Sequence, residues 1–94
     1  MAVTFEWDPE KAARNLAKHG VHFDEASTVF SDPLGRIVDD PRHSRGEDRS
    51  VLIGFSSAQR LLAVMFTDRK NRIRIISSRP VTRAERRTYE ENAR

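Results

Sequence analysis

The chain has 94 residues, of which 37% are hydrophobic and 33% charged, with a net charge of +3. We expect one domain over residues 1–94, because domains usually span about 100 to 200 residues. The absence of cysteine excludes disulfides, thiolate metal sites and cysteine nucleophiles. No apolar run reaches the roughly 18 residues of a membrane span and no secretory signal is visible, so we expect a soluble, cytoplasmic protein.

The N-terminal third predicts a short strand followed by two helices. Thr4–Trp7 alternates as a strand does, and Asp8-Pro9 is typical of a helix start. Gly20 is placed to end this helix, and cations in its last turn suit the helix dipole. Its apolar residues lie at helical spacing and predict a buried stripe: Ala12, Ala13, Leu16 and Ala17.

A second short helix is predicted over Asp24–Phe30, and Asp32-Pro33 ends it. Its inward side is expected to consist of Phe23, Ala26, Val29 and Phe30.

Four further strands and a last helix follow. The strands are predicted at Gly35–Asp39, Val51–Phe55, Leu61–Thr67 and Arg72–Ser78, with a polar loop over residues 40–48. Short links predict antiparallel neighbours, and the nearly continuous apolar run Leu61–Thr67 predicts the centre of the sheet. Thr82 and Glu85 form a capping box that opens a helix to about Asn92. The fold class is therefore α+β, with an antiparallel sheet of about four to five strands, two N-terminal helices and one C-terminal helix.

The turn between the last two strands determines which side chains share a face. With Lys70-Asn71 as a two-residue loop, Arg69 opposes Arg72 and Thr67 opposes Arg74. Opposed residues share a face, so Arg69, Arg72 and Arg74 are expected on one side of the sheet. Arg79 has the opposite parity and is expected beyond the apolar face formed by Ile73 and Ile75. There it would pair with an acid or bind phosphate.

The charge is unevenly divided along the chain. Residues 1–48 contain six Lys/Arg against ten Asp/Glu, whereas residues 49–94 contain eleven against four. Ten of those eleven cations are Arg, whose planar guanidinium suits phosphate. This pattern indicates a polyanion binder, and the alternative is an ordinary solvated surface.

Few residues offer proton-transfer chemistry. His43 lies in the polar loop, and an unperturbed imidazole titrates near neutrality; the alternative is a merely solvated side chain. Metal binding by His43 with Asp39, Asp40 or Glu47 would follow no recognised spacing, so neither a metal nor a cofactor is expected. His19 is explained by the helix dipole, and Tyr89 either anchors the last helix or contacts a base.

RNA cleavage without metal needs a base for the 2′-hydroxyl, cations for the crowded phosphorane and an acid for the leaving oxygen. The chain contains the residue types that suffice for this reaction, although composition permits it without demanding it.

The ordered motifs resemble the BrnT family of bacterial type II toxins. The resemblance rests on Phe5-Glu6-Trp7-Asp8-Pro9, Lys11, Asn15, Lys18-His19-Gly20-Val21, Val29-Phe30, His43-Ser44, Glu47, Arg49, Ile53-Gly54, Arg74-Ile75-Ile76-Ser77, Arg79 and Glu85-Arg86 with Tyr89. It spans essentially the whole chain. The chain departs from the family pattern at Lys70-Asn71, where a Gly-containing turn is expected, and at Ser78, where Ala is usual.

The resemblance implies a RelE-like fold and a ribonuclease that blocks translation. It also implies a BrnA-like antitoxin partner and a toxin–antitoxin complex that binds operator DNA. The expected catalytic residues are His43, Glu47, Arg79, Arg69, Lys18 and His19, and the expected nucleic-acid contacts are Arg49, Arg72, Arg74, Arg83, Arg86 and Tyr89. We interpret His43 as general acid/base, Arg69 and Arg79 as phosphate ligands, and Glu47 as a residue that orients His43 or acts as base.

Two other functions compete with a ribonuclease. A non-catalytic nucleic-acid-binding module acting in autoregulation would carry the same charge and yield no cleavage product. A plain protein-interaction domain would bind RNA weakly and with little dependence on salt.

Overall fold

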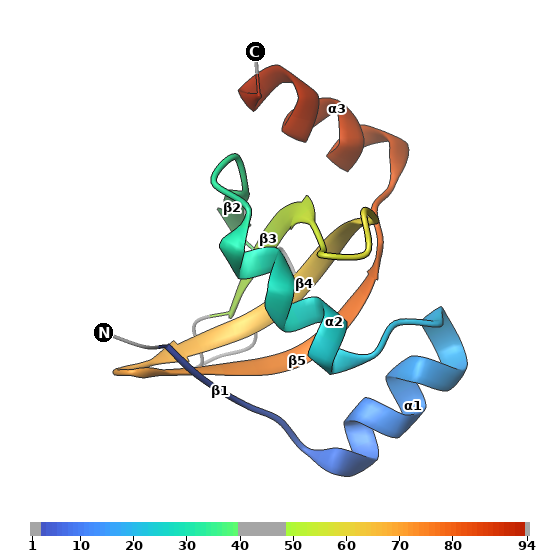
Figure 1. Ribbon diagram of the computed structural model, residues 1–94, viewed down its shortest axis with the longest axis vertical. Coiled ribbons are helices and arrows are strands. Elements are labelled where there is room, and N and C mark those ends of the chain that lie inside the picture. Colours follow the sequence, from blue (N-terminus) through green and yellow to red (C-terminus); the bar gives the residue numbers. More distant parts are fainter. Residues whose placement is uncertain (1–2, 40–48, 94) are drawn as a thin grey trace.

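The computed structural model describes residues 3–39 and 49–93, and shows a five-stranded sheet with helices on both sides (Figure 1). The strand order is β1-β5-β4-β3-β2. The elements are β1 (Thr4–Glu6), α1 (Pro9–His19), α2 (Phe23–Thr28), a 3₁₀ turn (Val29–Ser31), β2 (Arg36–Asp39), β3 (Arg49–Phe55), β4 (Leu61–Arg69), β5 (Arg72–Pro80) and α3 (Arg83–Asn92). None of the described helices is long and apolar enough to cross a membrane.

The predicted α+β class is confirmed, with β4 at the centre of the sheet. Strands β2 to β5 pair antiparallel as expected, but β1 lies parallel to β5 at the edge, from Thr4 beside Arg72 to Glu6 beside Arg74. The difference has a simple cause. Two helices intervene between β1 and the rest of the sheet, and a connection of that length lets a strand enter in parallel.

Local signals fix both ends of α1. The Asp8 side chain accepts a hydrogen bond from the Glu10 amide, and Gly20 ends the helix in the left-handed region with φ 69°. The predicted apolar stripe, however, is wrong. Only Ala12 of that stripe packs on the core; Leu16 is 37% exposed, and Ala13 and Ala17 are exposed too.

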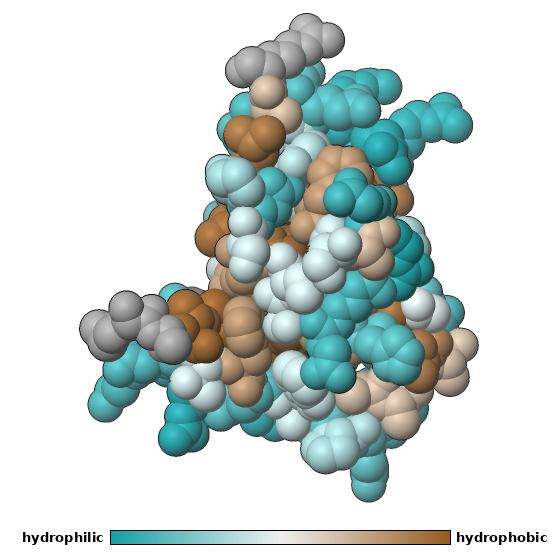
Figure 2. Space-filling model, in the orientation of Figure 1, coloured by the Kyte–Doolittle hydropathy of each residue, from teal (hydrophilic) through white to brown (hydrophobic). Residues whose placement is uncertain are grey.

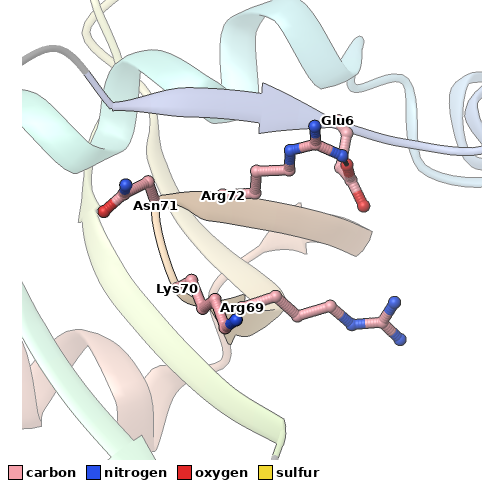
Figure 3. Close-up of a pocket in the computed structure, with 5 residues that line it drawn as sticks. All are labelled: Glu6, Arg69, Lys70, Asn71 and Arg72. Carbon is pink, nitrogen blue, oxygen red and sulfur yellow. Dashed lines mark hydrogen bonds and ion pairs between the residues drawn. The ribbon is translucent and has the colours of Figure 1, made fainter.

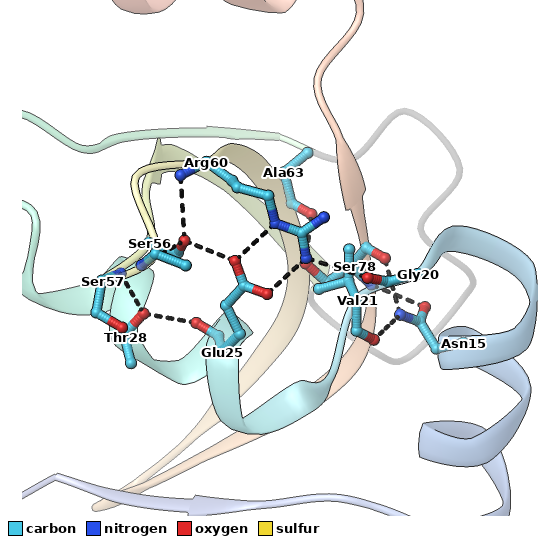
Figure 4. Close-up of polar contacts among 11 residues, drawn as sticks. Asn15, Gly20, Val21, Glu25, Thr28, Ser56, Ser57, Arg60, Ala63 and Ser78 are labelled. Atoms are coloured by element: carbon cyan, nitrogen blue, oxygen red, sulfur yellow. Dashed lines mark hydrogen bonds and ion pairs between the residues drawn. The ribbon is translucent and has the colours of Figure 1, made fainter.

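Asn15 fastens α1 in place of an apolar stripe (Figure 4). Its amide group donates to the carbonyl oxygens of Ser78 (2.8 Å) and Val21 (3.0 Å). Its oxygen accepts from the Ser78 amide (3.0 Å), so this side chain pairs with β5 as a neighbouring strand would. Beyond Arg74, where pairing with β1 stops, Asn15 thus satisfies backbone groups at the edge of the sheet.

One side of the sheet, which we call the helix face, is covered by α1 and α2. Phe23, Ala26 and Val29 are buried there and Phe30 is half-buried, as predicted. The aromatic rings meet edge to face, with interplanar angles of 80° for Phe30 and Phe66 and 79° for Trp7 and Phe23. The ring centroids are 5.0 and 5.9 Å apart.

We call the opposite side the arginine face, because it carries Arg49, Arg69, Arg72, Arg74 and Arg79. It also has a second apolar cluster, at the end covered by α3. The predicted capping box is confirmed: the Thr82 hydroxyl accepts from the Glu85 amide, and the Glu85 carboxylate accepts from the Thr82 amide. Tyr89 is the buried residue of this helix. Its ring packs edge to face on Phe55, at 5.4 Å between centroids.

An ion pair joins α2 to the turn between β3 and β4 (Figure 4). The Glu25 carboxylate accepts from the Arg60 guanidinium (2.9 Å from Nε) and from the Ser56 hydroxyl (2.7 Å). Arg60 also donates to the Gly20 carbonyl oxygen (3.1 Å), which connects α1 to the same cluster. These bonds from Arg60 hold the pKa of Glu25 below its usual value, outweighing the opposite effect of burial. In the view of Figure 2, hydrophilic residues gather at the upper right and along the lower edge, and hydrophobic residues reach the surface at the left.

Replacing Asn15 by Ala should destabilise the protein more than replacing Leu16 by Ala. Asn15→Ala leaves two carbonyl groups and one amide without their partner, a loss on the order of 3 kcal/mol. Leu16→Ala removes a partly exposed side chain and should cost less than about 1 kcal/mol. Urea unfolding followed by circular dichroism measures both. A larger loss in the Leu16 variant would show that the apolar stripe holds the helix after all.

Acid should destabilise the protein in part through Glu25. A carboxyl group whose pKa is lowered by folding contributes stability above its usual pKa of 4.5, and this contribution is lost as pH falls through the lowered value. The difference in melting temperature between pH 7 and pH values below about 4.5 should therefore shrink in Glu25→Gln. The exposed Glu91→Gln variant is the matched control. Identical pH profiles for the parent and Glu25→Gln would contradict this assignment.

Candidate nucleic-acid interface

A bulge in β5 brings the arginines onto one face. Phe66 pairs with Ile75 but Met65 pairs with Ser77, so Ile76 is an extra residue that reverses the alternation of side chains. Arg69, Arg72 and Arg74 share a side, as predicted from the hairpin. The expectation that Arg79 lies on the opposite side is wrong, because the bulge pairs Arg79 with Ala63 on the arginine face. Parity counted from the turn cannot anticipate an inserted residue.

A row of three residues crosses the arginine face. Thr67 in β4 pairs with Arg49 in β3 on one side and with Arg74 in β5 on the other. Thr67 is 3% exposed, and among the described residues its hydroxyl oxygen has no hydrogen-bond partner. Burying an unsatisfied hydroxyl costs about 1–3 kcal/mol. A buried hydroxyl without a partner among the described residues therefore lies between two arginines of the sheet.

The next row lies at the β4–β5 turn and borders an open pocket of about 490 Å³ (Figure 3). Arg69 and Arg72 oppose each other there. In Figure 3 the side chain of Arg69 extends from β4, whereas that of Arg72 approaches Glu6 of β1. Lys70 adopts a positive φ of 55° in the turn. Gly is the residue that favours this backbone region, and here the position is occupied by Lys.

Glu6 partly neutralises this group of cations. Its carboxylate lies 3.1 Å from an Arg74 nitrogen and 3.5 Å from an Arg72 nitrogen. The side chains are 27%, 35% and 68% exposed for Glu6, Arg74 and Arg72, so an incoming anion can reach the guanidinium groups and compete with Glu6. Glu6 was not among the residues predicted for the site. Glu6 could be recognised because it pairs with Arg74 and so lies on the same face of the sheet. That inference requires the pairing of β1 with β5 to be known.

Arg79 is tied to α3. Its two terminal nitrogens donate to the two carboxylate oxygens of Glu85 at 2.7 and 2.9 Å, a bidentate pair that is largely buried. These bonds lower the pKa of Glu85, against the smaller opposing effect of burial. Of the two predicted settings for Arg79, the structure shows the pairing with an acid. Glu85 thus holds the guanidinium in one orientation at the end of the arginine face.

Tyr89 is an anchor of α3. Its hydroxyl donates to the Asp32 carboxylate at 2.7 Å, and that carboxylate also accepts from the backbone amides of Phe55 and Leu34. Burial and the neighbouring Asp32 raise the pKa of Tyr89 to about 12. The phenol is therefore protonated at neutral pH and is only 6% exposed, so we do not include it among the contacts to nucleic acid.

The remaining predicted residues lie apart from these rows. Lys18 and His19, at the end of α1, line a separate pocket of about 290 Å³ with Ser77. Arg83 and Arg86 are exposed on α3. His43 and Glu47 lie outside the described residues; the chain leaves the described sheet at Asp39 and re-enters it at Arg49, beside the row that contains Thr67. Within residues 3–39 and 49–93, no group of three His, Asp or Glu side chains is arranged to hold a metal ion.

Comparison with known proteins identifies the family and a similar fold. Residues 7–85 match the family model described as the ribonuclease toxin BrnT of type II toxin–antitoxin systems. The fold is similar to the crystal structure of the Brucella abortus ribonuclease toxin BrnT, with a TM-score of 0.66 and 22% identity over 87% of this chain and 100% of that one. No curated protein sequence matches the chain. The chain belongs to the BrnT family of ribonuclease toxins of type II toxin–antitoxin systems.

Proposed function

We propose that the protein is an endoribonuclease toxin that cleaves RNA on its arginine face without a metal ion and thereby inhibits translation in the cytoplasm. The observation that carries the proposal is the row of Arg49, Thr67 and Arg74, in which a buried hydroxyl lies between two cations. A phosphodiester supplies oxygen atoms for all three side chains. Guanidinium groups aimed at a phosphorane stabilise charge as it develops, which is a large contribution to catalysis.

Proton transfer is assigned to His43. An arginine stays protonated throughout the working pH range and cannot act as a base. We assign His43 as general acid/base, with Glu47 orienting it, because both belong to the segment that enters the sheet at Arg49. In the reaction we propose, His43 takes the proton of the 2′-hydroxyl as its oxygen attacks the adjacent phosphorus, and the bond from phosphorus to the 5′-oxygen breaks. The same proton is then delivered to the leaving 5′-oxygen, which gives a 2′,3′-cyclic phosphate and a 5′-hydroxyl.

The type II toxin–antitoxin family implies a protein partner that neutralises the toxin. We propose a BrnA-like antitoxin, and binding of the joint complex to operator DNA. An antitoxin that covers the arginine face would block RNA directly. The second candidate function, a non-catalytic nucleic-acid-binding module in autoregulation, draws on the same cations, so product formation decides between the two.

A gel assay of the purified, partner-free chain on total RNA in EDTA tests the cleavage. The parent should produce fragments, and His43→Ala should lose them while still binding RNA. Cleavage retained in His43→Ala would move the proton transfer to another group. A parent that binds RNA and forms no product, with or without ribosomes, would favour the binding module.

The Thr67→Val variant tests whether Thr67 contributes to RNA binding independently of its effect on stability. The change replaces a buried hydroxyl that has no partner among the described residues by a methyl group of the same shape, so stability should stay equal or rise. Affinity for a non-cleavable 2′-O-methyl RNA should fall about tenfold, the equivalent of one hydrogen bond to a charged group. Val64→Thr, on the helix face, is the matched control and should lose stability instead. Unchanged RNA affinity in Thr67→Val would remove Thr67 from the site.

A further inference from the structure

One side of α1 carries cations at helical spacing beside the edge of β5. Lys11, Arg14 and Lys18 follow one another at intervals of three and four residues, so they project from the same side of the helix. Asn15 lies within this stripe, and its bonds to Ser78 fix the stripe against β5. The cations and His19 line an open pocket of about 290 Å³ together with Asn15, Ile76 and Ser77.

This pocket adjoins the arginine face. Pairing between β1 and β5 ends at Arg74, so the pocket opens on the edge that β1 leaves uncovered. Ser77 pairs with Met65 on the arginine face, and it follows Arg74 by only three positions in the strand. Along a strand this corresponds to about 10 Å. A strand of nucleic acid that contacts Arg74 can therefore pass over the edge of β5 and reach α1.

The charges in this pocket differ from those of the ion-paired arginines. Arg60, Arg74 and Arg79 each have a carboxylate partner. Among the described residues, no ion pair is formed by Lys11, Arg14 or Lys18, and no carboxylate lines their pocket. Neighbouring like charges repel unless an anion lies among them.

The helix dipole does not account for this stripe. It explains cations in the last turn, such as Lys18 and His19. Lys11 lies in the first turn, where the dipole disfavours a positive charge. A cation placed there against the dipole, in line with two others, indicates an anionic ligand along the whole stripe.

We propose that this pocket is a second phosphate-binding subsite, which holds a backbone phosphate of the same RNA strand a few nucleotides away from the bond that is cleaved. The inference rests on the proposed function, since the arginine face supplies the first subsite. Two lysines are flexible point charges and select phosphate without reading a base, so this contact is independent of sequence. Lys18 and His19 then position the strand, and the proton transfer stays at the other subsite.

RNA of two lengths tests the subsite with the full chain. The probes are a 2′-O-methyl trimer, long enough for the arginine face alone, and a decamer that reaches both sites. Lys11→Ala/Lys18→Ala should bind the trimer as the parent does and bind the decamer about tenfold more weakly. The slope of log affinity against log salt should become shallower for the decamer by about 0.7 for each phosphate that the variant no longer neutralises. The charge-preserving Lys11→Arg/Lys18→Arg variant should retain decamer binding.

Each outcome has one meaning. Equal losses for the trimer and the decamer would show a general effect of net charge and would overturn the subsite. Decamer binding and salt slope unchanged in the double Ala variant would overturn it as well. If the parent binds neither probe, the proposed function fails first, and that result is distinct from failure of the second subsite. Unchanged melting temperatures show that the variants remain folded.

Discussion

The inserted residue in β5 is the constraint on which the site depends. Before Ile76 the strand alternates in step with the β4–β5 turn, and after it the alternation is reversed. The reversed alternation turns Ser78 into the interior, where it is completely buried. Its hydroxyl donates to the Ala63 carbonyl oxygen at 3.1 Å. The reversal also turns Arg79 to the side where Glu85 lies on α3. Without the bulge, Arg79 would project toward α1 and α2, and the cations would be divided between two faces.

Strand β5 also positions the two elements that lie along its outer edge, β1 and α1. Its first half accepts β1, which contributes Glu6, and its second half accepts Asn15, which fixes the cation stripe of α1. Each neighbour therefore satisfies backbone groups of β5 and delivers a charge to the sheet. This coupling explains why a helix with little apolar contact is still firmly placed. Three buried hydrogen bonds to one amide side chain do what a hydrophobic stripe does in most helices.

Sequence patterns predicted the structural features that depend on residues close together in the chain. Helix caps at Asp8, Gly20 and Thr82, the central strand and the opposition of Arg69 and Arg72 all follow from local chemistry and one turn. The parallel entry of β1, the role of Asn15 and the side taken by Arg79 depend on contacts distant in sequence. Glu6 and Thr67 belong to the site only because their neighbours across the sheet are arginines. Glu6 lies within the motif Phe5-Glu6-Trp7-Asp8-Pro9, but that motif does not show that its side chain reaches the arginines.

The chemistry of the described residues also limits where proton transfer can occur. The arginine face presents guanidinium groups, which stabilise negative charge but do not exchange protons near neutrality. Tyr89 keeps its proton because burial and Asp32 raise its pKa to about 12. The Glu85 carboxylate is bonded to Arg79, and that bond lowers its pKa. The proposed proton transfer therefore needs a different kind of group, such as an imidazole, whose unperturbed pKa lies near neutrality. His19 and His43 are the two histidines among the predicted catalytic residues, and the proposal assigns the transfer to His43. The arginine face would then bind and stabilise, while the segment that leads into Arg49 would move the protons.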